Sequence, residues 1–155
     1  MTENYGKKFE QIFRNDFLKS VPNSTIDRLY DSMSGFKAVS NISDFIGYSY
    51  PHIFYLECKT HKGASIPFDC ISQYDALKEK VGIKGVRAGV VLWLYEKDKV
   101  FYIPISTITQ MKNDGCKSVG IKALDKYKIY EIPSIKKRTY MTSNYSILLT
   151  LQEGE

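Results

Sequence analysis

The sequence predicts an α/β protein in which a mixed central sheet is flanked by helices. First, apolar residues recur at helical spacing between Tyr5 and Ser20. Second, the segment from Val86 to Tyr95 is almost continuously apolar, as in a central strand covered on both faces. Third, the expected elements follow one another as helix, strands, helix, strand, strand, helix. This order favours a layered fold with the first helix on one side of the sheet and the second on the other.

The first half of the chain predicts one helix and three strands. Phe9, Phe13 and Phe17 give the helix an apolar stripe, and Pro22 ends it. Serine- and glycine-rich sequence over residues 31–41 is typical of a loop. The expected elements are a helix over residues 5–20, a short strand over 25–30, and a hairpin whose strands cover 44–48 and 52–59.

The second half predicts two more helices and a returning pair of strands. Proline suits the first position of a helix, so Pro67 is expected to open a second helix that runs to about Lys80. Strands follow over residues 86–95 and 100–103, then a helix over 105–113 and a short strand over 127–132. The basic stretch "SIKKRTY" has no assigned element, and the apolar tail over 145–151 is expected to dock as a strand or a helical turn.

Composition narrows the class of protein. The 155 residues fit one domain, and the net charge of +5 permits a nucleic-acid partner without demanding one. The three cysteines, Cys58, Cys70 and Cys116, show neither a CxxC pair nor zinc spacing, which indicates free thiols in a reducing cytoplasm. The sequence shows no signal peptide and no apolar run of roughly 20 residues. We therefore expect a soluble cytoplasmic protein with no membrane partner.

Charged residues stand where two predicted strands begin and end. Asp44 opens one strand, and Glu57 and Lys59 lie near the end of the next, so a tight hairpin brings them to the same end of the sheet. Residues two apart on a strand share a face, so Glu57 and Lys59 project together while Cys58 points away. Two carboxylates and an ammonium group beside apolar neighbours are costly unless they pair or bind a metal ion.

These groups allow two interpretations. In the first, two carboxylates and the Cys58 carbonyl form an oxygen-rich site for Mg²⁺ or Mn²⁺, which would activate water and neutralise an attacked phosphate. Lys59 would then orient that water or stabilise the developing charge. In the second, Asp44 caps a turn and Glu57 and Lys59 form a surface ion pair on an edge strand.

The spacing of Asp44, Glu57 and Lys59 resembles the D…(D/E)xK core of the restriction-endonuclease-like nucleases, the PD-(D/E)xK superfamily. More specifically, the chain resembles the RecU family of Holliday junction resolvases. The resemblance rests on "NYGKKFEQIF", "SDFIGY", "YLECKT" and "GASIPFDCISQ", which occur in the family's order. It implies a restriction-endonuclease-like core in a single nuclease domain over residues 1–155.

The resemblance also implies a set of site residues. Catalytic roles fall on Glu10, Asp44, Glu57, Lys59 and Gln73. Mg²⁺, with Mn²⁺ able to substitute, would be held by Asp44, Glu57, the Cys58 carbonyl and, through water, Glu10. DNA contacts are expected at Lys7, Arg28, Thr60, Lys62 and Ser65. The cluster Lys136, Lys137 and Arg138 fits phosphate contacts as well as ordinary solvated charge.

The implied function is a Mg²⁺-dependent, structure-specific endonuclease that acts as a homodimer and resolves Holliday junctions by paired cuts. RecU proteins insert a long stalk before the catalytic Asp, whereas only the short loop over residues 31–43 is available here. Junction selectivity is therefore left open. One alternative is a restriction or repair nuclease that acts on duplex or flapped DNA, and another is a catalytically inactive DNA-binding protein.

Overall fold

The computed structural model describes residues 4–30, 32–34, 37–39 and 41–151. Within these ranges, six strands form one mixed sheet in the order β1-β4-β5-β7-β8-β10. β5 and β7 are parallel, and the other neighbours are antiparallel. The strands are β1 (Ser24–Arg28), β4 (Phe45–Ser49), β5 (His52–His61), β7 (Val86–Leu94), β8 (Lys99–Pro104) and β10 (Tyr130–Glu131).

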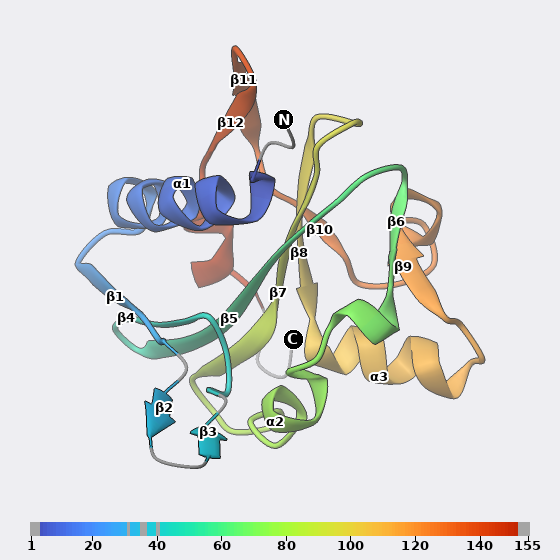
Figure 1. The fold of residues 1–155 in the computed structure, drawn as a ribbon, viewed down its shortest axis with the longest axis horizontal. Helices are drawn as coiled ribbons and strands as arrows, with labels where there is room; N and C mark the ends of the chain where they lie inside the picture. The colour runs from blue at the N-terminus through green and yellow to red at the C-terminus, as the bar shows by residue number, and fades with distance from the viewer. Residues whose placement is uncertain (1–3, 31, 35–36, 40, 152–155) are drawn as a thin grey trace.

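Helices and two-stranded ribbons complete the described part of the chain (Figure 1). The helices are α1 (Tyr5–Ser20), α2 (Tyr74–Lys78) and α3 (Ile105–Asn113), with 3-10 turns at Phe68–Cys70, Ile121–Ala123 and Ser146–Leu149. The ribbons pair β2 (Ser32–Ser34) with β3 (Lys37–Val39), β6 (Ser65–Pro67) with β9 (Ser118–Gly120), and β11 (Ser134–Lys137) with β12 (Tyr140–Ser143).

Helix α1 has the bounds that the sequence predicts. Its stripe of Phe9, Phe13 and Phe17 is buried against the sheet. The Asn4 side chain caps the first turn by accepting a hydrogen bond from the Lys7 amide at 3.1 Å. Replacing one of these buried rings by alanine would cost about 3–5 kcal/mol, because the cavity left behind refills only in part.

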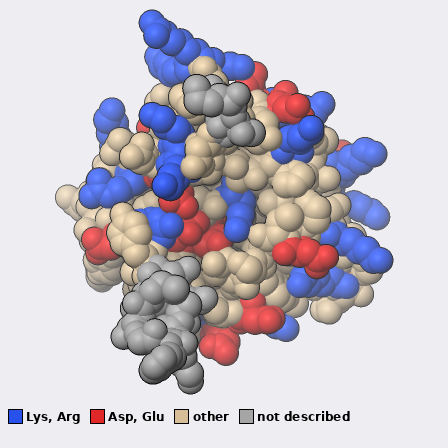
Figure 2. Space-filling model, viewed as in Figure 1, with Lys and Arg blue, Asp and Glu red and all other residues tan. Residues whose placement is uncertain are grey.

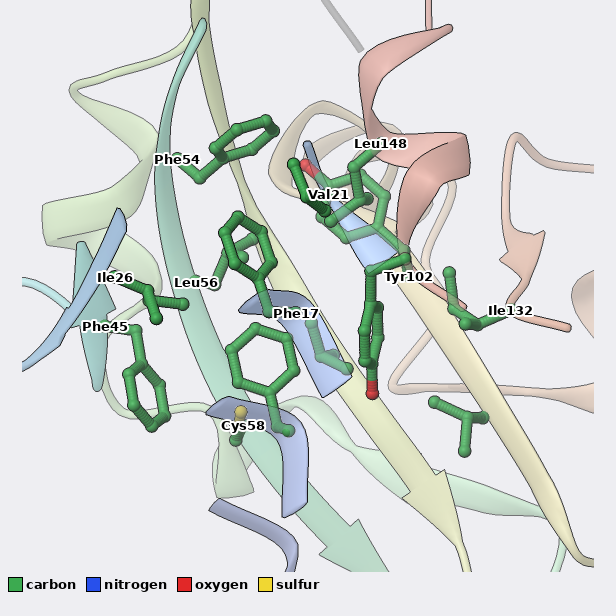
Figure 3. Packing of buried hydrophobic residues seen from close by; sticks show 14 of the residues in the cluster. Phe17, Val21, Ile26, Phe45, Phe54, Leu56, Cys58, Tyr102, Ile132 and Leu148 are labelled. Atoms are coloured by element: carbon green, nitrogen blue, oxygen red, sulfur yellow. The ribbon is translucent and has the colours of Figure 1, made fainter. Parts of the chain in front are cut away.

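Alternate residues of the sheet strands face two separate cores. Phe54, Leu56 and Cys58 of β5 pack on the face that α1 covers (Figure 3). Val90 and Leu92 of β7 pack on the opposite face with α2 and α3. Figure 1 shows α1 on one side of the sheet and α2 and α3 on the other. The predicted fold class, and the sides predicted for the first two helices, are confirmed.

The β4–β5 hairpin fixes which residues meet at its open end. Phe45 pairs with Leu56, so Asp44, immediately before β4, lies opposite Glu57. Beyond Leu56, β5 continues to His61 in parallel pairing with β7. This longer strand carries the charged residues past the start of β4, to a place where neither β4 nor β1 covers them.

The segment 67–80 is not the single helix that the sequence predicts. Pro67 ends β6, which pairs with β9, and the Phe68 amide donates to the Lys117 carbonyl at 3.0 Å. A 3-10 turn follows, and α2 covers only Tyr74–Lys78. Pairing with a distant strand therefore outweighs the local preference of proline for the start of a helix.

Other differences are smaller. The strand predicted over residues 127–132 shortens to β10, and the basic stretch near residue 137 forms the β11–β12 hairpin. The apolar tail docks as a 3-10 turn, as predicted. The loop predicted over 31–41 contains the β2–β3 ribbon, and residues 31, 35, 36 and 40 of that prediction lie outside the described residues.

The three cysteines are free thiols, as predicted. Cys58 is buried, Cys70 is exposed and Cys116 is partly buried. Over the residues that the structure describes, none of the helices has the length and apolar character needed to span a membrane.

Candidate active site

Two backbone amides, those of Asp44 and Cys58, hold the Asp44 and Glu57 carboxylates across the open end of the β4–β5 hairpin. The Asp44 amide donates to Glu57 Oε1 at 2.9 Å, and the Cys58 amide donates to Asp44 Oδ2 at 2.9 Å. The Glu57 side chain is only 1% exposed. The hairpin register thus holds two carboxylates close together, and each uses one oxygen to accept a backbone hydrogen bond.

A cation faces the second oxygen of each carboxylate. Arg28 Nη2 lies 3.6 Å from Asp44 Oδ1, and Lys59 Nζ lies 3.6 Å from Glu57 Oε2. Both distances exceed those of a good hydrogen bond. Glu57 and Lys59 project together, as the strand spacing predicts, and Cys58 belongs to the core on the α1 face.

Arg28 connects Glu10 of α1 to this pair. Its Nε lies 3.1 Å from Glu10 Oε2 and its Nη2 lies 3.4 Å from Glu10 Oε1, a two-point contact between guanidinium and carboxylate. Arg28 also donates to the backbone carbonyls of Leu29 and Asp44. The guanidinium stands at the end of β1, where α1 passes close to the start of β4.

Glu10, Asp44 and Glu57, together called the acidic group below, carry more negative charge than their burial favours. Burial, followed by the neighbouring Asp44 carboxylate, raises the pKa of Glu57 to about 8. Burial is also the main cause that raises the pKa of Glu10, with Asp44 contributing. Burial raises the pKa of the Cys58 thiol well above its usual value, so this thiol stays protonated. An added cation beside Asp44 and Glu57 would relieve the repulsion between them.

The side chains alone supply part of the ligand set that Mg²⁺ needs. Asp44 and Glu57 supply the hard carboxylate oxygens that Mg²⁺ prefers, and Mg²⁺ usually keeps several of its waters. Among the described residues, no three His, Cys, Asp or Glu side chains converge as a ready metal-binding group. A metal ion here would therefore need backbone or water oxygens as further ligands, and the Cys58 carbonyl stays a prediction for that place.

The predicted DNA-contact residues fall in several places. Lys7 lines a hollow of about 230 Å³ together with Glu10 and Arg28. Thr60 and Lys62 line a second hollow of about 530 Å³, beside the first residues of α1. Figure 2 shows acidic side chains gathered near the middle of one face, with Lys and Arg side chains around them.

Two predicted residues have other neighbours. Gln73 precedes α2, and its Oε1 accepts a hydrogen bond from the Ser72 hydroxyl at 2.7 Å. Ser65 is exposed on β6, where its backbone pairs with Gly120. Their roles in catalysis and in DNA binding stay predictions.

Sequence reasoning treated Arg28 only as a contact for DNA and missed its contacts within the acidic group. Its guanidinium lies between Glu10 and Asp44 and packs 5.7 Å from the centre of the Phe45 ring. The sequence held a weak signal for this, because the strand over residues 25–30 was expected to precede the strand that begins at Asp44. Nothing in the spacing of the residues shows that β1 and β4 are neighbours.

No protein-family model and no curated protein matches this chain. Among solved structures, the chain is similar to Hjc, a Holliday junction resolvase from the archaeal hyperthermophile Archaeoglobus fulgidus. The TM-score is 0.57 at 14% sequence identity, and the match covers 79% of this chain and 93% of Hjc. At this identity the likeness shows a shared fold.

Proposed function

We propose that the protein is a RecU-like, Mg²⁺-dependent endonuclease that cuts four-way DNA junctions in pairs of strands. The observation that carries this proposal is the pair of Asp44 and Glu57 carboxylates held by the Cys58 and Asp44 amides, with Lys59 3.6 Å from Glu57, on a fold shared with a junction resolvase. We also propose that residues 1–155 form one nuclease domain, which acts as a homodimer in the cytoplasm.

In this proposal Asp44, Glu57 and the Cys58 carbonyl hold Mg²⁺, and Glu10 assists through water. Mn²⁺ would be able to substitute. When bound, the ion would supply a more acidic water and neutralise charge on the attacked phosphate. Lys59 donates hydrogen bonds to the phosphate oxygens that become more negative in the transition state. Water attacks phosphorus, the bond to the 3′ oxygen breaks, and a 5′-phosphate and a 3′-hydroxyl remain.

Arg28 has a different role in the proposal. It keeps Glu10 and Asp44 close without a direct clash of their charges, because its guanidinium contacts both. Phosphate binding falls to the exposed lysines Lys7 and Lys62, with Thr60 and Ser65 beside the path of the strand. Gln73 is proposed to approach the site when DNA is bound.

A supercoiled plasmid with an extruded cruciform tests the proposal directly. Paired cuts convert this plasmid to a linear form, whereas a single cut gives only a nicked circle. Wild-type protein should give linear product in Mg²⁺ or Mn²⁺ and none in EDTA. Asp44→Asn should abolish cutting while leaving junction binding within about twofold, and Asp27→Asn, an exposed carboxylate on β1, should behave as wild type.

Three results would contradict the proposal. Equal cutting of a four-way junction and of linear duplex of the same sequence would indicate the restriction or repair nuclease, an alternative that the short segment over residues 31–43 leaves open. An Asp44→Asn variant that still cuts would remove the assigned site. No metal-dependent cutting of any branched or linear DNA would indicate an inactive DNA-binding protein.

A further inference from the structure

The β11–β12 hairpin carries unbalanced positive charge. Its tip holds Lys136, Lys137 and Arg138, which are exposed, and the sequence has no acidic residue between Glu131 and Glu153. Figure 1 shows the hairpin standing out from the body of the protein. Figure 2 shows Lys and Arg side chains gathered at the top of the same view, where Figure 1 draws this hairpin.

Two of these three cations have no ion-pair partner among the described residues. Lys136 Nζ pairs with Asp98 Oδ1 at 2.9 Å. In the part of the chain that the structure describes, neither Lys137 nor Arg138 has a carboxylate within ion-pair distance. The two side chains are therefore available to an anionic partner without first breaking an ion pair.

The hairpin is fixed to α1 at its base. The Ser143 amide donates to Asp16 Oδ2 at 2.9 Å, and the Tyr145 amide donates to Ser20 Oγ at 2.9 Å. Met141 of β12 is buried in the core that α1 covers. A two-stranded ribbon alone is only marginally stable in water, so these contacts give the exposed tip a defined position.

Arg138 occupies a turn position that its backbone conformation does not require to be arginine. Arg138 has a φ of 53°, a left-handed conformation that glycine or asparagine adopts more readily. Arginine here gives the turn no stability that glycine would not give. Its side chain is exposed and makes no ion pair among the described residues, which leaves it accessible to an anionic partner.

The hairpin and the acidic group are attached to the same helix. Asp16, which holds the hairpin, lies six residues after Glu10, or about 9 Å along the axis of α1. Duplex DNA presents one negative charge per about 1.7 Å of its length, so an arm that leaves the acidic group presents phosphates along its whole path. A basic projection beside that path meets a phosphate at any base sequence.

We propose that the β11–β12 hairpin is a second DNA-binding site, where Lys137 and Arg138 bind the phosphate backbone of a duplex arm outside the cutting site. This inference rests on the proposed function, because it takes branched DNA as the partner. The contact is independent of sequence and depends on the length of the arm. An arm too short to reach the hairpin gains nothing from it.

Binding assays in EDTA test this inference without cutting. The variant is Lys137→Ser with Arg138→Ser, and the control is Lys122→Ser with Lys126→Ser, two exposed lysines that follow β9. On a junction with arms of about 25 base pairs, the hairpin variant should bind roughly 5- to 20-fold more weakly. Its plot of log affinity against log salt should be shallower by about 1.8, because two phosphate contacts are lost at about 0.9 each.

Further measurements separate a contact with the DNA arm from a general loss of positive charge or of folding. With arms of about 8 base pairs the hairpin variant should match wild type, and Lys137→Arg with Arg138→Lys should keep wild-type affinity. Circular dichroism melts confirm that each variant is folded. Equal losses in the hairpin and control variants, or an equal loss on short and long arms, would overturn the inference.

The same experiment distinguishes this inference from the proposed function. Hairpin-dependent binding of long arms, together with an Asp44→Asn variant that still cuts, would retain the hairpin contact and remove the assigned catalytic site. Normal cutting by the hairpin variant with unchanged affinity would remove the hairpin contact and retain the assigned catalytic site. Hairpin-dependent binding to phosphatidylserine vesicles, with none to DNA, would assign the hairpin to a membrane surface and overturn the inference.

Discussion

The Asp44 backbone amide donates a 2.9 Å hydrogen bond to Oε1 of Glu57, across the open end of the β4–β5 hairpin. The Cys58 amide returns a bond of the same length to the Asp44 carboxylate. The two acids are thus positioned by the backbone before any metal ion or DNA binds. Such preorganisation reduces the cost of assembling a charged site at the moment of reaction.

The stability of the metal-free protein should fall as pH rises from about 5 to 8. The pKa of Glu57 is raised from 4.5 to about 8, so in this interval the folded state holds a proton that the unfolded state has released. The free energy of unfolding then decreases with pH, by roughly 3–5 kcal/mol at most. Thermal melts in EDTA across this pH range would measure the decrease.

The control for this pH dependence is Glu57→Gln, which can still accept the bond from the Asp44 amide and cannot ionise. Its melting temperature should change less with pH than that of wild type. At pH 8, Mg²⁺ should raise the melting temperature of wild type and leave that of the variant nearly unchanged. A wild-type curve parallel to that of Glu57→Gln would contradict the role of this carboxyl group.

Arg28 and Glu10 should be energetically coupled. Because both side chains are about a quarter exposed, we expect a coupling of only about 1 kcal/mol from a double-mutant cycle with Arg28→Ala and Glu10→Ala. Urea unfolding of the two single variants and the double variant measures it. The exposed pair Lys99 and Glu131 serves as the comparison and should give less than about 0.5 kcal/mol.

Asp16 should stabilise the protein as the anchor of the hairpin. Asp16→Ala leaves the buried Ser143 amide without its acceptor and should cost about 1–3 kcal/mol. Asp16→Asn keeps an acceptor oxygen and should cost less than half as much. Hydrogen exchange should show faster exchange at the Ser143 amide in Asp16→Ala, and equal protection in both variants would show that this bond does not hold the hairpin.

Local sequence pattern is enough for elements that one stretch of chain determines. The α1 stripe of Phe9, Phe13 and Phe17 predicts the helix and Pro22 predicts its end, because both signals lie within one continuous stretch of chain. The Glu57 and Lys59 contact follows from the two-residue period of a strand. The tight link between strands over residues 44–59 likewise predicts that Asp44 lies beside Glu57.

Features made by distant pairing were not predictable in this way. The segment after Pro67 carries a good helix start, and its pairing with β9, some 50 residues later, decides otherwise. The position of Arg28 between Glu10 and Asp44 depends on β1 pairing with β4. The β11–β12 hairpin bends at Arg138, in a turn without glycine, so the usual turn signal is absent.

The crossed hydrogen bonds between Asp44, Glu57 and Cys58 make the chemistry conditional on correct strand pairing. A slip of one residue between β4 and β5 would turn Glu57 toward the α1 face and present the Cys58 thiol in its place. A chain paired in the wrong register would therefore lack the Glu57 carboxylate beside Asp44. Under the proposed function, an incompletely folded molecule would not cut DNA, and cutting would require the completed β4–β5 hairpin.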